Sequence, residues 1–250
     1  MNGKKKIVIV GATSAIAEQC ARLWVQSKPI ALTLIARDTQ KTGTIVTDLQ
    51  IRSPQSNINI IYTDFLNPKK IKETVEKISA SGKIDIALIA HGSLPEQSSC
   101  QDDLQTCWYA LEVNGSSPAL WAEAFAQHME KNNHGTIALI GSVAGDRGRK
   151  SNYVYGAAKG LVARYAQGLQ HRFAGTAVNI VLIKPGPTDT PMTANLKRQG
   201  AKLSPAEDVA KKIVNDINFG KKIVYTPRKW WLIMMVVRHL PSFIFNKMNI

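Results

Sequence analysis

The sequence lacks a disulfide framework, a long hydrophobic run and an even balance of charge. Its three cysteines, Cys20, Cys100 and Cys107, are odd in number and do not have the spacing of metal ligands, so we expect reduced thiols and no metal. No apolar run reaches the roughly 18 residues of a membrane-spanning helix. The N-terminal MNGKKKIVIVG is basic and then apolar, but its apolar run is too short for a signal peptide. We therefore expect it to form a first strand, in a cytoplasmic protein.

Acidic residues are scarce, because 18 Asp and Glu stand against 32 Lys and Arg, for a formal net charge of +14. The imbalance is concentrated late, since residues 197–250 hold 11 Lys and Arg against 3 Asp and Glu. A solvated basic face would explain it, and an anionic membrane surface or an acidic substrate are functional alternatives. The basic residues are interleaved with Ile, Met and Val rather than with a groove-reading motif, so we do not expect a nucleic-acid partner.

Apolar runs of strand length alternate with stretches of helical apolar spacing along the first 226 residues. The predicted strands are 5–10, 30–36, 57–63, 84–90, 136–140, 177–183 and 222–226. The predicted helices are 15–27, 68–80, 102–131, 152–173 and 205–218, the last with Pro205 at its first position after a capping box over residues 204–207. Because each strand is apolar throughout, the pattern indicates an α/β fold with a parallel sheet buried on both faces. Without repeats or a linker, we expect one domain over 1–226 and a C-terminal extension, 227–250.

The stretch 141–159, GSVAGDRGRKSNYVYGAAK, carries a hydroxyl, a phenol and an ammonium group. Tyr155 and Lys159 are four residues apart, so on a helix they share one face. A phenol titrates near ~10, and we expect the Lys159 charge to lower its pKa toward neutral pH, where general acid–base catalysis is most effective. Ser142 follows an apolar strand, and ligands of open α/β sheets bind at that end of the strands. The same spacing would also suit a helix with one core aromatic and one surface lysine.

A phosphate site is indicated near the N-terminus. The first strand runs into a glycine turn, Gly11-Ala-Thr-Ser14, and then into a helix whose free backbone N–H groups can bind an anion. The second strand ends at Arg37-Asp38. A basic residue at this point suits the 2′-phosphate of NADP, and an acidic residue suits the ribose of NAD. Because Arg37 comes first, we expect NADP, with NAD as the alternative.

The glycine turn, Asn114 on a middle helix, Ser142 after the fifth strand, YGAAK on the next helix and PGPTDT after the sixth strand occur in one order. With these motifs the sequence resembles the short-chain dehydrogenase/reductase family over about residues 5–226. The resemblance implies a doubly wound, Rossmann-type sheet with NAD(P) across the carboxyl ends of its strands. It also implies that Ser142 binds the substrate carbonyl and that Tyr155 donates the proton. Lys159 would lower the Tyr155 pKa and hold the nicotinamide ribose, while Asn114 would anchor a water in the proton relay.

The resemblance further implies the cofactor contacts. Asp64 would meet the adenine, Gly92 would line the cofactor, and the segment after the sixth strand would surround the nicotinamide amide. The implied cofactor-binding residues are Gly11, Thr13, Ser14, Ala15, Ile16, Arg37, Asp64, Phe65, Ala90, Gly92, Tyr155, Lys159, Pro185, Gly186, Thr188 and Thr190.

Two motifs depart from the family pattern. The turn TGxxxGxG reads VGATSAIA, with Ala15 and Ala17 at the second and third glycine positions. If both lie in the first helical turn, their φ is negative and alanine is allowed, although a methyl group narrows the approach to a pyrophosphate. The motif NNAG reads IAHG, and we interpret His91 as a packing residue rather than a catalytic one.

The extension contains the apolar run Trp230–Val237 between Arg228-Lys229 and Arg238. Basic flanks, tryptophans and a span too short to cross a bilayer describe an anchor at an anionic membrane interface over residues 228–250. An oligomer contact or a lid on the substrate cleft would suit these residues equally well.

The motifs GATSAIAE and AHG, with the tail, are similar to one branch of the family, which contains the ketoreductase component of decaprenylphosphoryl-ribose 2-epimerisation. That similarity implies a keto-sugar carried on a polyprenyl phosphate. Our leading hypothesis is an NAD(P)H-dependent ketoreductase of a lipid-linked or other amphiphilic ketone, homo-oligomeric and located at the inner face of a membrane. The alternatives are a 3-oxoacyl reductase acting on a carrier-bound chain and an NAD(P)-sensing regulator without catalysis.

Overall fold

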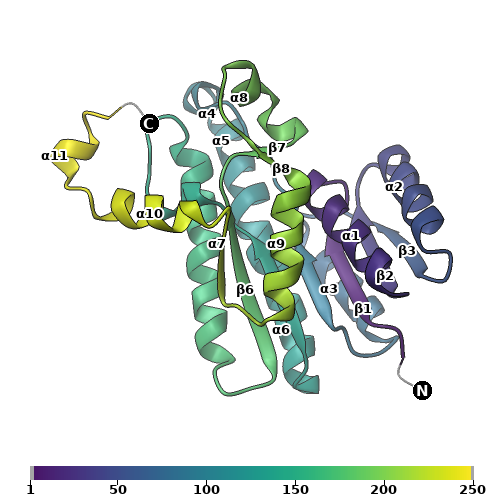
Figure 1. The fold of residues 1–250 in the computed structure, drawn as a ribbon. Coiled ribbons are helices and arrows are strands. Elements are labelled where there is room, and N and C mark those ends of the chain that lie inside the picture. Colours follow the sequence, from purple (N-terminus) through teal and green to yellow (C-terminus); the bar gives the residue numbers. More distant parts are fainter. Residues whose placement is uncertain (1–2, 249–250) are drawn as a thin grey trace.

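Seven parallel strands form the central sheet in the order β3-β2-β1-β4-β5-β6-β9, with helices on both faces (Figure 1). The computed structural model describes residues 3–248. The strands of this sheet are β1 (Lys6–Val10), β2 (Ala31–Ala36), β3 (Asn57–Tyr62), β4 (Ile86–Ile89), β5 (Gly135–Ile140), β6 (Val178–Pro185) and β9 (Ile223–Thr226). The order reverses between β1 and β4, which is where doubly wound sheets bind ligands. The expected fold class is thereby confirmed.

Helices flank this sheet, and a short two-stranded sheet lies apart from it. The α-helices are α1 (Ala15–Ser27), α2 (Thr39–Arg52), α3 (Pro68–Ser79), α4 (Gln97–Asp102), α5 (Leu104–Leu111), α6 (Ser117–Asn132), α7 (Tyr153–Arg172), α8 (Ala194–Arg198), α9 (Ala206–Asn218), α10 (Lys229–His239) and α11 (Ser242–Phe245). A π-helical turn, η1 (Glu112–Ser116), and two 3₁₀ turns, η2 (Val143–Asp146) and η3 (Pro191–Thr193), complete the helical segments. The small sheet pairs β7 (Thr188–Asp189) with β8 (Ser204–Pro205).

The core is divided by the sheet into two apolar layers. On one face, α1, α2 and α9 pack through residues such as Trp24, Leu49 and Ile213. On the other face, α3, α6 and α7 pack through residues such as Phe125 and Leu169. Because β1, β4 and β5 are apolar at every position except Lys6 and Thr136, they supply side chains to both layers. This double burial holds the carboxyl ends of the strands in fixed positions.

The structure corrects the sequence interpretation at three places. Helix α2 was not predicted, because its sequence buries only Thr42, Ile45 and Leu49 and has no strong apolar period. The single helix expected over 102–131 begins at Leu104 and runs as α5, η1 and α6 to Asn132, and the separate helix α4 precedes it. The capping box expected over residues 204–207 is absent, because Ser204 pairs in β8 and Pro205 is the N-cap of α9.

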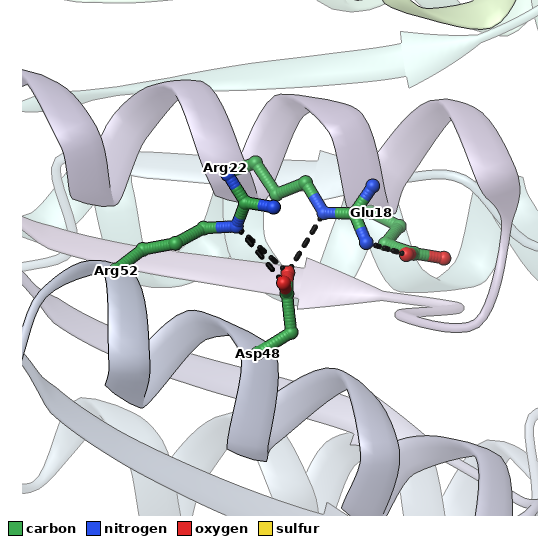
Figure 2. A network of polar contacts seen from close by, with 4 residues as sticks. All are labelled: Glu18, Arg22, Asp48 and Arg52. Carbon is green, nitrogen blue, oxygen red and sulfur yellow. Dashed lines mark hydrogen bonds and ion pairs between the residues drawn. The ribbon is translucent and has the colours of Figure 1, made fainter.

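Polar contacts compensate for the weak apolar face of α2 (Figure 2). The Asp48 carboxylate accepts hydrogen bonds from Arg52 Nε at 3.0 Å and from Arg22 Nε of α1 at 2.8 Å. Arg22 also pairs with Glu18 at 2.7 Å. The hydrogen bond from Arg52, with that from Arg22, lowers the pKa of Asp48 despite its partial burial. This network joins α1 to α2 beside β2.

The C-terminal extension leaves the α/β body after β9 and projects from its side as α10 and α11 (Figure 1). Arg147, which follows η2, donates hydrogen bonds to the carbonyl oxygens of Val237 and Leu240, both at 2.6 Å. Its guanidinium also lies 3.8 Å from the centre of the Phe245 ring. Met234 is the buried residue of α10. The extension is thus attached to the body at the turn that follows the strand of Ser142.

Candidate active site

A cavity of about 730 Å³ lies at the carboxyl ends of the strands, at the point where the strand order reverses. It is bounded by the loops after β1, β2, β4, β5 and β6 and by the start of α10. The sequence-predicted site residues found in its wall are Gly11, Thr13, Ser14, Ala15, Ile16, Arg37, Phe65, Ala90, Gly92, Asn114, Ser142, Tyr155, Lys159, Pro185, Gly186, Thr188 and Thr190. Asp64 is not among them, since it is exposed and its Oδ1 accepts a hydrogen bond from the Leu66 N–H at 2.9 Å.

The glycine turn after β1 brings backbone close to the cavity. Gly11 has a φ of +81°, and a Cβ at this position would lie 2.5 Å from the His91 backbone nitrogen. Helix α1 begins at Ala15, so Ala15 and Ala17 both lie in its first turn, where alanine is allowed. Ala17 is fully buried in the core below α1, and only Ala15 lines the cavity. Of the two glycine positions that hold alanine here, only Ala15 can therefore affect the shape of the cavity.

His91 lines the cavity as a neutral, buried imidazole. Its Nε2 lies 2.8 Å from Ser117 Oγ, and Ser117 donates its own hydroxyl proton to the Phe65 carbonyl at 2.6 Å. Ser117 can therefore only accept from His91, which places the imidazole proton on Nε2. Burial, with the Lys159 and Arg37 charges, lowers the pKa of His91 to about 3. Its Nδ1 is left as a buried acceptor without a partner among the described residues.

Ser142, Tyr155 and Lys159 lie close together in the wall of the cavity. Ser142 follows β5 as the N-cap of η2, and its Oγ accepts a hydrogen bond from the Ala144 N–H at 3.1 Å. A side-chain hydrogen bond joins Ser142 to Tyr155. Lys159, one turn further along α7, is buried and donates to the Ile140 carbonyl at 3.0 Å. Its Nζ lies 5.8 Å from the centre of the Tyr155 ring.

The Tyr155 pKa is raised in the protein without cofactor, whereas we expected Lys159 to lower it. Burial raises the pKa of Tyr155 to about 12, and the hydrogen bond with Ser142 offsets only part of this. Burial also lowers the pKa of Lys159 to about 8. At neutral pH the phenol is therefore protonated, and the ammonium group still carries its charge most of the time.

Asn114 and Gly92 fix the wall opposite Lys159. Asn114 is fully buried within η1, a π-helical turn of the kind often found at functional sites. Its Oδ1 accepts from the Ser93 N–H at 2.9 Å, and its Nδ2 donates to the Ala110 carbonyl at 2.9 Å. A Cβ at Gly92 would lie 2.8 Å from Asn114 Oδ1 and 3.6 Å from Lys159 Nζ. The Asn114 side chain thus positions the loop after β4.

The loop after β2 presents two cations to the cavity, Arg37 and Lys41. Asp38 lines the same region, but its Oδ1 accepts the Lys41 N–H at 2.9 Å as the N-cap of α2. Arg37 lies 5.1 Å from the Phe65 ring centre. Lys41 was missed because α2, at whose start it lies, was not predicted from the sequence.

Six further residues of the wall were not named by sequence reasoning, although a lid on the substrate cleft was one alternative for the extension that supplies Trp230. They are the apolar residues Leu94, Met192, Leu196 and Trp230, together with Arg149 and Asn152. Trp230 comes from α10 and packs on Gly186, where an added Cβ would lie 1.9 Å from the indole Nε1. These residues come from separate loops and helices, and no spacing in the sequence predicts that they lie together.

This wall fits an NAD(P) dinucleotide by its own chemistry. The glycine cradle and the N-terminus of α1 suit a pyrophosphate, and the unpaired His91 Nδ1 is an acceptor for a hydroxyl or amino group. Arg37 and Lys41 suit an additional phosphate, and Lys159 retains donors beyond its bond to Ile140.

Comparisons with known proteins agree with this geometry. The family model described as short chain dehydrogenase matches residues 5–201. An uncharacterized oxidoreductase of Streptomyces coelicolor is 24% identical over 245 residues, covering 98% of this chain and 96% of that protein. An uncharacterized oxidoreductase of Mycobacterium tuberculosis is 28% identical over 171 residues, 68% of each chain.

Solved structures share the fold. A short-chain dehydrogenase from Sphingobium yanoikuyae in complex with NADPH superposes with a TM-score of 0.82 at 17% identity, over 98% of this chain and 96% of that chain. A short-chain dehydrogenase from Burkholderia cenocepacia in complex with NADP gives a TM-score of 0.83 at 15% identity, over 99% and 98% of the two chains. With a family model that matches most of its length, the chain belongs to the short-chain dehydrogenase family and is an NAD(P)-dependent oxidoreductase.

Proposed function

We propose that the protein is an NADPH-dependent ketoreductase of an amphiphilic ketone, with a lipid-linked keto-sugar as the leading substrate class. The observation that carries the reaction class is the meeting of Ser142, Tyr155 and Lys159 in one wall of the cavity. A bound nicotinamide would supply the hydride. Tyr155, protonated at neutral pH because its pKa is raised to about 12, donates the proton that the nascent alkoxide requires. Ser142 orients the carbonyl oxygen toward that phenol, and Lys159 supplies positive charge beside it.

A preference for NADPH follows from the loop after β2. Arg37 and Lys41 offer two cations there, while the Asp38 carboxylate is already engaged by the start of α2. An acid that is free to bind a ribose diol would favour NAD instead. Replacing Arg37 by Ala removes a charge-assisted contact, so the KM for NADPH should rise about 10- to 100-fold while the KM for NADH stays unchanged. An equal rise for both cofactors would contradict this assignment.

An amphiphilic substrate suits the apolar side chains of the cavity wall and the surface beside it. The outer face of the extension exposes large apolar side chains, with Trp231 51%, Leu232 61%, Val236 63% and Phe243 71% exposed. Arg228, Lys229, Arg238 and Lys247 accompany them, and residues 217–248 contain no acid. No helix within the described range 3–248 is long and apolar enough to cross a membrane. We propose that this face lies in the headgroup region of an anionic membrane.

The reaction is tested by following NADPH and NADH oxidation against keto-sugar lipids and ketoacyl thioesters. Faster turnover of the thioesters would assign the protein as a 3-oxoacyl reductase instead. Tyr155→Phe should lower kcat by about 100-fold or more with NADPH binding intact, because general acid catalysis contributes at least this much. Tyr153→Phe is the matched control, since Tyr153 is exposed and its hydroxyl contacts only Gln101 in the described structure. Absence of turnover in the wild type, with cofactor bound, would indicate an NAD(P)-sensing regulator.

The membrane contact is tested by co-sedimentation with anionic and with neutral vesicles. Deleting the extension is unsuitable, because it would remove Trp230 from the cavity and the partners of Arg147. Leu232→Ser with Val236→Ser leaves both in place and should abolish binding to anionic vesicles, whereas Ile51→Ser, at an equally exposed position on α2, should not. Self-association without vesicles that the same pair abolishes would assign the face to a second copy of the chain.

A further inference from the structure

Arg149 places a guanidinium group in the cavity wall, and none of the described residues 3–248 forms an ion pair with it. It is partly buried, and its Nε is a buried donor with no hydrogen-bond partner in the part of the chain that the structure describes. Among the described residues that line the cavity, Asp38 is the only acid, and it is engaged at the start of α2. Burial lowers the pKa of Arg149, and no neighbouring charge is among the causes. The side chain nevertheless stays charged, because a guanidinium cannot be deprotonated in proteins.

Other cations that are withdrawn from solvent in this protein have partners. Lys184 pairs with Asp146 in the interior, and the buried Lys159 donates to the Ile140 carbonyl at 3.0 Å. Arg147, two residues before Arg149, donates to two backbone carbonyls. A withdrawn charge without such a partner destabilises the fold. Unpaired charges that destabilise the fold are retained at sites where a bound ligand supplies the missing partner, and Arg149 lines a ligand cavity.

The surroundings of Arg149 describe the rest of that ligand. Asn152, on the same loop, has a buried Oδ1 without a partner in the described structure and also lines the cavity. Tyr155 follows one turn later, so both groups lie on the segment that leads into the proton donor. The same cavity is also lined by the apolar side chains of Leu94, Leu196 and Trp230. The site therefore offers one cation, one hydrogen-bond acceptor and an apolar surface beside the reacting carbonyl.

We propose that Arg149 binds an oxyanion of the substrate, a phosphate ester or a group of the same charge, whose apolar portion lies against Leu94, Leu196 and Trp230. This inference rests on the proposed ketoreductase function and adds the substrate's charge to it. The planar fork of a guanidinium matches two phosphate oxygens at once. The side-chain amide oxygen of Asn152, Oδ1, would accept a hydrogen bond from a hydroxyl group near that phosphate. Arg149 is thus a specificity-determining residue, separate from the cations at Arg37 and Lys41.

The test uses n-octyl phosphate below its micelle concentration, 1-octanol and inorganic phosphate as probes, titrated into the NADP-loaded full-length protein by calorimetry. The wild type should bind octyl phosphate more tightly than either of the other two, because only octyl phosphate has both the charge and the apolar chain. Arg149→Met should weaken octyl phosphate about 10- to 100-fold, with Arg149→Lys in between. Lys150→Met, which removes the same charge from an exposed neighbour, should leave the affinity unchanged.

Further measurements separate this site from the cofactor site and from a structural role. The affinity for NADPH should be the same in Arg149→Met and in the wild type, and the melting temperature of the variant should be unchanged or higher, because no native partner is lost. Equal octyl phosphate affinity in the wild type and in Arg149→Met would overturn the inference, as would a loss of NADPH affinity in the variant. A wild type that neither binds NADPH nor reduces a ketone would instead refute the proposed function.

Discussion

Gly186 and Trp230 form a contact whose disruption can be predicted in sign and magnitude. A Cβ on Gly186 would lie 1.9 Å from Nε1 and 2.4 Å from Cδ1 of the Trp230 indole, far inside van der Waals distance. The indole is rigid, so Gly186→Ala must displace either Trp230 or the loop after β6. Overpacking of this kind costs about 1–3 kcal/mol. Because Trp230 begins the extension, we expect Gly186→Ala to loosen α10 as well as to narrow the cavity.

A double-mutant cycle with Trp230→Ala separates this clash from other effects of the methyl group. In the Trp230→Ala background the three atoms nearest to the added Cβ are gone, so the alanine should be tolerated. The free energy of unfolding from urea titration should then show a coupling between the two sites of about 1–3 kcal/mol. The KM for the ketone should recover in the double variant relative to Gly186→Ala alone. If Gly186→Ala costs the same free energy in both backgrounds, the contact does not explain the need for glycine.

Three further predictions concern the cofactor turn, the proton donor and the α1–α2 network. Gly11→Ala should lower the free energy of unfolding by about 2 kcal/mol or more and abolish NADPH binding, because φ is +81° and the added methyl group would clash with His91. Gly43→Ala on α2, where the space around the glycine is open, should instead stabilise the protein by about 0.5–1 kcal/mol, as thermal unfolding would show. The rate kcat/KM for reduction should fall above about pH 8 as Lys159 loses its proton, and Lys159→Arg should remove that limb from the pH profile. Asp48→Asn should cost about 0.5–1 kcal/mol at pH 7. Since folding lowers the pKa of Asp48, this cost should begin to shrink below about pH 4 and should vanish only below the lowered pKa of the folded state, as urea titrations across pH would show.

The parallel sheet could be predicted from the sequence because each central strand is a short apolar run with no alternation. Strand β5 was expected at 136–140 and spans Gly135–Ile140, and helix α1 agrees at both ends with the expected 15–27. Helix α2 was not predicted because its stability depends on Asp38 at its N-terminus and on ion pairs with α1, and neither produces a periodic apolar pattern in the sequence.

The site divides in the same way between local and tertiary signals. The spacing of Tyr155 and Lys159 alone predicts that they share a helix face. The position of Ser142 could also be predicted, because it directly follows strand β5 and so lies at the carboxyl edge of the sheet. The pKa directions could not be foreseen, because burial, which raises the pKa of Tyr155 and lowers that of Lys159, exists only in the folded chain. Trp230 joins the cavity from a helix 75 positions beyond Tyr155, and no pattern within either segment predicts that contact.

The single buried side chain of α10 has a consequence for how the protein moves. With Met234 as its buried anchor and most of its length exposed, α10 gains little from apolar burial. Its amide hydrogens should therefore exchange through local opening, at a free energy well below that of global unfolding. Each such opening carries Trp230 away from Gly186, so the residence time of a bulky product should be governed by this fluctuation rather than by the rigid sheet.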